Sequence, residues 1–167
     1  MKSVKKIANE IFIEGLSGMA TGLFATLIIG TIIQQIGTLI PGTIGSLLYI
    51  IGKMAASVTG VGIGCGVAVR FKESPLVIMS AATCGMVGAF ASKILAGSVL
   101  VDGNIVYAGP GEPLGAFIAA LAGIYMGRLV SGKTKVDIVI TPLLSILTGS
   151  TVGLLLGPPI SKFMTII

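Results

Sequence analysis

Histidine and tryptophan are absent from this chain of 167 residues, and only 10% of its residues are charged. The absence of histidine removes the most common general base and the most common metal ligand of proteins. The sequence also contains no CxxC pair, no phosphate-binding loop and no pair of carboxylates on one helix face. We therefore expect no catalytic residues of the chain's own, no metal and no cofactor.

The low charge also argues against a soluble domain, in which about 25% of residues are charged. Hydrophobic residues make up 54% of the chain, and its mean hydropathy is +1.06. The net charge of +5 falls in short connections, which favours membrane topology over nucleic-acid binding. Cys65 and Cys84 both lie in apolar segments, so we interpret them as small core residues rather than as a disulfide or a metal pair.

Apolar runs of about 18 residues or more are long enough to cross a hydrocarbon core of about 30 Å. The sequence predicts an all-α integral membrane helical bundle, a single domain over residues 1–167, with about five transmembrane helices. These lie at residues 16–36, 44–69, 75–95, 114–130 and 138–156. The second span is long and rich in glycine, so it either tilts strongly or breaks between Ala55 and Gly60. The fourth is either a short full crossing or a re-entrant segment, and the distribution of positive charge favours the crossing.

The connections and the end of the chain carry turn and kink signals. Residues 98–107 alternate around Asp102-Gly103-Asn104, which predicts a short extracytoplasmic β-hairpin. Pro142 predicts a kink in the last span because proline removes one helical hydrogen bond. Gly157-Pro158-Pro159 predicts the end of that span, and the apolar tail after it resembles the start of another helix.

Positive charge is distributed unevenly between the two sides of the predicted bundle. With five crossings, one side receives the eight residues Lys2, Lys5, Lys6, Arg70, Lys72, Arg128, Lys133 and Lys135. The other side receives only Lys93 and Lys162. Since cytoplasmic loops carry the excess of positive charge, the N-terminus is predicted to be cytoplasmic. The first 14 residues form a basic amphipathic stretch that we expect at the cytoplasmic surface.

Glycine pairs with small-xxx-small spacing indicate close helix packing, because burial alone does not join helices within lipid. The pattern occurs at Gly18/Gly22, Gly60/Gly64, Gly62/Gly66, Gly123/Gly127 and Gly149/Gly153/Gly157. Packing within one subunit is the simpler interpretation. A dimer face, or backbone exposed along a ligand path, is the alternative.

Polar groups inside or beside the spans are the candidates for substrate binding, because embedded ionisable groups are costly and are usually functional. Lys53 lies inside the second span, where it either snorkels outward or has a buried role. Glu112 precedes the fourth span, either as a plain cap or as an acceptor for a sugar hydroxyl. Gln34 and Gln35 lie near the end of the first span, either at the headgroup level or facing a polar solute.

Irregular helices add three further candidates, because transporters use interrupted helices to place backbone groups at a substrate. Thr141 is a candidate binding residue next to the expected kink at Pro142. Gly60 is a candidate hinge in the glycine-rich second span. A static packing kink is an equally good interpretation of Pro142.

Several blocks of the chain resemble the EIIC-type membrane proteins of the bacterial phosphotransferase system, in the branch that includes perfringolysin-regulator-like proteins. They are EGLSGMATGLFATLIIGTI (14–32), GAFIAA (115–120), GRLVSGKTKVDI (127–138), Thr141-Pro142 and GPPIS (157–161). The blocks cover most of the chain in the same order. Members of this family are about twice as long, so the chain resembles an N-terminal half.

The resemblance implies a sugar permease component of a bacterial plasma membrane, while separate cytoplasmic phosphocarrier subunits transfer the phosphoryl group. The expected partners are the lipid bilayer, a sugar, those phosphocarrier subunits, and a second copy or half-chain in an oligomer. A membrane regulator or sensor derived from a permease is the first alternative function. A glycine-packed oligomeric channel or half-unit is the second.

Overall fold

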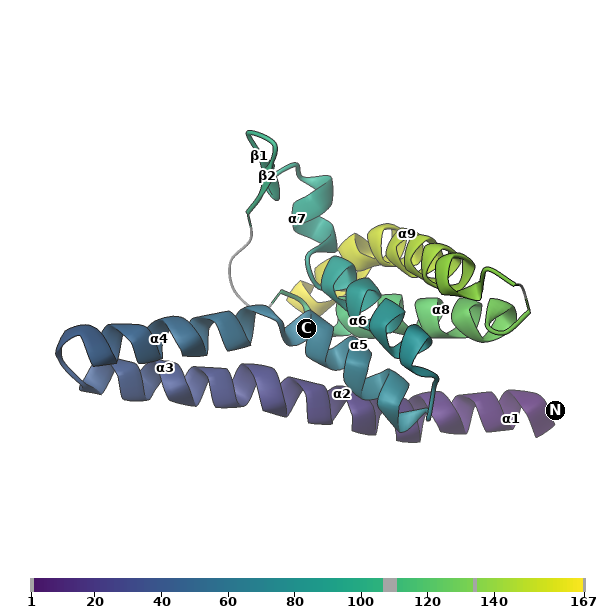
Figure 1. Ribbon diagram of the computed structural model, residues 1–167, viewed down its shortest axis with the longest axis horizontal. Helices are drawn as coiled ribbons and strands as arrows, with labels where there is room; N and C mark the ends of the chain where they lie inside the picture. The colour runs from purple at the N-terminus through teal and green to yellow at the C-terminus, as the bar shows by residue number, and fades with distance from the viewer. Residues whose placement is uncertain (1, 107–110, 134, 167) are drawn as a thin grey trace.

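The computed structural model describes residues 2–106, 111–133 and 135–166. It is almost entirely helical (Figure 1). The N-terminal segments are α1 (Lys2–Asn9), η1 (Glu10–Gly15), α2 (Leu16–Leu23), η2 (Phe24–Ile28) and α3 (Ile29–Leu39), where η marks a π-helical turn. The middle segments are α4 (Gly42–Ser57), α5 (Thr59–Arg70), α6 (Pro75–Ala89) and α7 (Ala91–Leu95). The remaining segments are β1 (Leu100–Val101), β2 (Asn104–Ile105), α8 (Pro113–Val130) and α9 (Asp137–Ile166).

The first five segments form one continuous helical rod. Backbone angles stay in the right-handed helical region at every join, and the two π-helical turns widen the rod without breaking it. The basic N-terminal stretch is therefore the first part of this rod and not a separate helix. The rod ends at Ile40, whose backbone is extended because the next residue is Pro41.

Helices α3 and α4 form an antiparallel hairpin that projects away from the other helices (Figure 1). Glycines let the two backbones approach, since a Cβ on Gly52 would lie 2.5 Å from the carbonyl oxygen of Gly30. A Cβ on Gly37 would lie 2.8 Å from the carbonyl oxygen of Gly45. The outer faces carry exposed isoleucine and leucine side chains, as expected for helices in contact with lipid.

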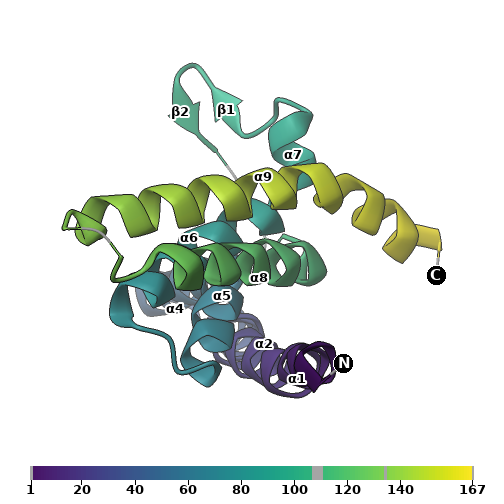
Figure 2. The ribbon, with the colours of Figure 1, turned by 90° about the vertical axis from the view of Figure 1, so that its right-hand side faces the viewer.

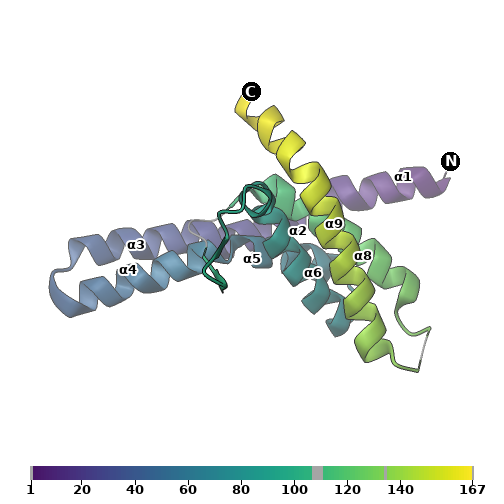
Figure 3. The same ribbon diagram turned by 90° about the horizontal axis from the view of Figure 1, so that it is seen from above.

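The main core lies where α5, α6, α8 and α9 pack together, with α2 against α5. Figure 2 shows α8 and α9 lying side by side, and Figure 3 shows α9 running obliquely to the rod. The fully buried apolar side chains of this core include Ile63, Val67, Val77, Ala81 and Ile124.

The glycine pairs found in the sequence pack within this one chain. A Cβ on Gly18 would lie 2.5 Å from the carbonyl oxygen of Gly66, and one on Gly22 would lie 2.1 Å from that of Gly62. Two of the predicted motifs therefore face each other at the crossing of α2 and α5. The motif at Gly60 and Gly64 packs on α6, and the two C-terminal motifs contact α6 and its neighbours. The interpretation as packing within one subunit is confirmed for these pairs.

Helices occupy all five predicted spans. Among the described residues, three helices are long and apolar enough to cross a membrane, and a fourth crossing results if the bent pair α4–α5 counts as one span. Helix α6 is apolar but has only 15 residues, so length and composition do not establish the fifth crossing. Helix α8 begins one residue before the predicted fourth span and ends at the predicted residue.

Two local predictions have different outcomes. The β-hairpin is present, with Leu100 paired to Ile105 and Val101 to Asn104 around the turn residues Asp102 and Gly103. Both turn residues have positive φ, as this two-residue turn requires. The predicted end of that segment at residue 107 lies outside the described residues. The helix does not end at Gly157-Pro158-Pro159, because α9 continues through both prolines to Ile166, although the candidate membrane span within it does end at Pro159.

Candidate functional site

A break in the second predicted span separates α4 from α5. Val58 lies outside helical geometry (φ −101°, ψ 23°), and the two helices are bent by 53°. The predicted break between Ala55 and Gly60 is therefore confirmed, and the alternative of one tilted helix is wrong. The hydroxyl of Thr59 donates to the carbonyl oxygen of Ala56 (2.6 Å), which satisfies a backbone group that the break leaves free.

Helix α5 begins directly against the end of α6. A Cβ on Gly60 would lie 2.6 Å from the carbonyl oxygen of Gly85 and 2.8 Å from the Cβ of Ala89. Only glycine permits this approach. Helix α6 itself ends at Ala89. The next residue, Phe90, is buried and has φ −111° and ψ 19°, and α7 starts immediately after it.

Glu112 brings a third helix end to the same place. Its backbone N–H donates to the carbonyl oxygen of Ala89 (2.8 Å), and Pro113 then starts α8. The preceding Gly111 has φ +76°, and a Cβ there would lie 2.6 Å from the same carbonyl oxygen. Three helix interruptions, at Val58, at Phe90 and before α8, therefore meet around Ala89. We name this place the helix-break junction.

Broken helices free backbone N–H and carbonyl groups, and transporters use such groups to bind polar solutes and ions. The junction adds the partly exposed Glu112 next to the start of α8, where the helix dipole favours a negative charge. On one side of the junction lies a mostly apolar pocket of about 270 Å³, lined by Met86, Val87, Phe90, Ile94, Val99 and Ile105. That pocket suits an apolar group and not a sugar.

Gln34, Gln35 and Lys53 lie on the α3–α4 hairpin. The side-chain amide of Gln34 donates to the carbonyl oxygen of Gly52 (3.4 Å), so it joins the two helices. Gln35 is exposed. Lys53 is also exposed, with its ammonium 5.7 Å from the centre of the Tyr49 ring. Snorkelling, rather than a buried role, fits this position of Lys53.

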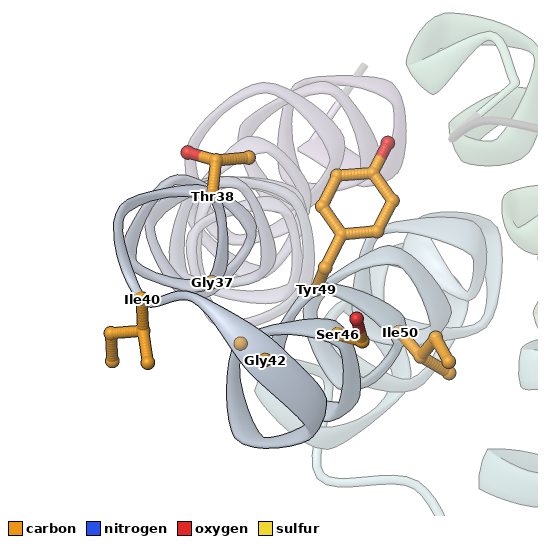
Figure 4. Close-up of a pocket in the computed structure, with 8 residues that line it drawn as sticks. Gly37, Thr38, Ile40, Gly42, Ser46, Tyr49 and Ile50 are labelled. Atoms are coloured by element: carbon orange, nitrogen blue, oxygen red, sulfur yellow. The ribbon is translucent and has the colours of Figure 1, made fainter.

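A pocket of about 440 Å³ lies at the tip of the same hairpin. Figure 4 shows its polar groups, with Thr38 on α3 and Ser46 and Tyr49 on α4. The tip therefore combines hydroxyl groups with an aromatic ring. It lies at the far end of the hairpin from the helix-break junction.

Thr141 is separated from the other candidates. Its hydroxyl is buried and donates to the Asp137 carboxylate (2.5 Å), which also accepts from the backbone N–H of Gly132 (2.8 Å). These bonds fasten the start of α9, whereas Glu112 lies at the opposite end of the antiparallel α8–α9 pair. The structure thus brings Glu112 and Gly60 together but places Thr141 and Pro142 elsewhere.

A charged cluster near the end of α8, on the same side of the chain as the start of α9 and away from Glu112, was not predicted. The Arg128 guanidinium lies 2.6 Å from the Glu10 carboxylate and also pairs with Glu73. It stands about equally far from two rings, 5.1 Å from the centre of Phe71 and 5.0 Å from that of Tyr125. We name these five residues the Arg128 cluster, which joins η1, the α5–α6 turn and α8.

A neighbouring pair, Arg70 and Glu14 (2.5 Å), joins the same π-helical turn to α5. Neither partnership was visible in the sequence, because the pairs span 55 residues or more. No group of metal-binding side chains occurs among the described residues.

Comparison with known proteins gives one match. The family model described as "Phosphotransferase system, EIIC" matches residues 13–167, which is most of the chain. No curated protein matches, and no solved structure matches.

Proposed function

Because the chain belongs to the phosphotransferase system EIIC family, as a membrane component of a sugar permease, we propose that it binds and translocates a sugar at the helix-break junction. The observation that carries this proposal is the meeting of three helix interruptions beside Glu112. Phosphoryl transfer would be carried out by cytoplasmic partner subunits, since the chain has no histidine.

Glu112 is the proposed hydrogen-bond acceptor for sugar hydroxyls. A carboxylate accepts strong hydrogen bonds from hydroxyl donors, and its place before α8 stabilises its negative form. The α4–α5 and α6–α7 interruptions also place polar backbone groups near Glu112 without additional charge in the membrane. Gln34 and Lys53 lie along the hairpin that leads away from the junction, so we assign them at most a secondary role.

Gly60 and Val58 provide the proposed hinge. The 53° bend and the close contact of Gly60 with α6 make the start of α5 sensitive to any movement of the hairpin. Movement of the α3–α4 hairpin relative to α6 and α8 would open the junction to one side of the membrane and then to the other. We place the N-terminus in the cytoplasm of a bacterial cell, from the distribution of lysine and arginine.

The test uses the purified full-length chain and a panel of sugars. A ligand that binds only the folded state raises its stability, by about 2.7 kcal/mol at 100 times the dissociation constant. We expect one sugar to raise the unfolding temperature, and Glu112→Gln to abolish that increase. Asp102→Asn, the same chemical change in the exposed hairpin turn, should keep it.

Uptake into vesicles then separates the possible functions. Binding with uptake of the same sugar supports the permease. Binding without uptake, with or without added phosphocarrier subunits, favours the regulator. Ion conductance without any selective sugar binding favours the channel, and an increase retained in Glu112→Gln refutes the proposed site.

A further inference from the structure

At the end of the molecule that carries the Arg128 cluster, the arginines form ion pairs and the lysines do not. Both arginines there are paired, Arg70 with Glu14 and Arg128 with Glu10 and Glu73. Five lysines are exposed and have no ion pair within the described part of the chain, namely Lys5, Lys6, Lys72, Lys133 and Lys135. We name these five the lysine surface.

The carboxylates at this end leave little negative charge to balance the lysines. Glu10, Glu14 and Glu73 are engaged by the arginines, and Asp137 accepts hydrogen bonds from Gly132 and Thr141. Among the residues named here, seven basic side chains stand against four carboxylates, so this end keeps an excess of three positive charges, which the lysine surface carries. It lies within a few residues of helix ends, because Lys72 follows α5 and Lys133 follows α8.

The lysines are spread over one end of the molecule and do not line a pocket. Figure 1 shows α1 and the connection between α8 and α9 at the same right-hand end, and Figure 3 shows them apart across it. Such a layout fits an extended negatively charged plane better than one small anion. It is also flanked by exposed apolar side chains, with Val4 at 70% and Ile138 at 76% exposure.

Basic side chains alternating with exposed apolar ones are typical of segments at a lipid interface, whereas an acidic soluble protein would leave those apolar side chains in water. We propose that the lysine surface binds the phosphate groups of anionic lipids in the adjoining membrane leaflet. The apolar neighbours insert among the acyl chains, and the lysines hold the headgroups. This inference uses the membrane location of the chain and is independent of the sugar site.

The test is lipid binding by the detergent-purified full-length protein, measured as retention of phosphatidylglycerol in native mass spectrometry, with phosphatidylcholine as the neutral comparison. The double variant Lys133→Gln/Lys135→Gln is matched to Lys53→Gln/Lys162→Gln, which removes the same charge elsewhere. Since each lysine near an anionic surface adds about fivefold to the affinity, the first double variant should weaken phosphatidylglycerol binding by about 25-fold. The matched variant should leave it nearly unchanged.

Three results would overturn the proposal. Equal retention of phosphatidylcholine would mean that headgroup charge is not recognised. An equal loss in the matched variant would mean that only net charge matters. Displacement of the lipid by inorganic phosphate or by polyglutamate at comparable concentration would assign the surface to a free anion or to an acidic protein. Lys72→Gln, a single exposed change beside the cluster, provides a second variant if the double variant fails to fold.

Discussion

Replacing Arg128 with methionine should be among the most destabilising single changes at this end of the chain. The arginine holds the carboxylates of Glu10 and Glu73 and lies against two aromatic rings. Methionine keeps much of the side chain's length but removes the charge. Two carboxylates would then remain beside each other without a cation, and that of Glu73 is only 10% exposed.

The expected magnitude lies between two limits. Removing one partner of a buried ion pair costs about 3–5 kcal/mol, whereas an exposed pair contributes about 0–1 kcal/mol. The Arg128 side chain is 32% exposed, so the pairs are only partly screened by solvent. Each cation–π contact adds about 0.5–1 kcal/mol. We expect Arg128→Met to lower the free energy of unfolding by about 3 kcal/mol.

The assay is equilibrium unfolding of the purified full-length chain in detergent micelles, with Arg70→Met as the matched control. That pair is more exposed, at 52% and 40%, so its loss should cost less than about 1 kcal/mol. Arg128→Lys should fall between the two, because lysine keeps the charge but lacks the planar fork that reaches both carboxylates. Equal costs for Arg128→Met and Arg70→Met would refute the reasoning.

Three further outcomes follow from packing and exposure. Gly22→Ala should destabilise the chain by about 1–3 kcal/mol, because the added Cβ would lie 2.1 Å from the carbonyl oxygen of Gly62. An unchanged unfolding curve would contradict this contact. A small maleimide should label Cys65, which is partly exposed, and leave the fully buried Cys84 unlabelled in the folded protein, as mass spectrometry of the labelled chain would reveal. Asn104→Cys should react with a membrane-impermeant thiol reagent in intact cells, when the two native cysteines have been replaced. Labelling from the cytoplasm alone would contradict the predicted topology.

Features governed by local chemistry were predictable from the sequence. Long apolar runs identified the helices, and the β-hairpin followed from Asp102-Gly103, a pair suited to positive φ. The break at Val58 was placed within the correct six residues because glycines follow it closely. These signals act over a few residues, so no knowledge of the tertiary structure is needed to interpret them.

Other features depend on contacts between distant segments. The prolines at 158 and 159 predicted the end of the last helix, yet α9 continues through them while Gly153 and Gly157 pack against α6, α7 and α8. Burial of a helix face against neighbours can outweigh the cost of a proline in a helix. Glu112 was identified as a candidate, but its meeting with the α4–α5 break at Ala89 depends on how α5, α6 and α8 pack.

The π-helical turn η2 has a consequence for how the chain tolerates changes in length. Gly22 contacts α5 and Gly30 contacts α4, the two halves of the bent second span, although eight residues separate the two glycines. In a regular α-helix of 3.6 residues per turn, eight residues overshoot two turns by about 80°. The wider turn at Phe24–Ile28 turns less per residue and brings the two glycines back into phase. Deleting one residue of η2 would leave a seven-residue spacing, about 20° short of two regular turns. A regular α-helix with this deletion would still present both glycines on nearly the same face, so we expect the contacts with α4 and α5 to tolerate it.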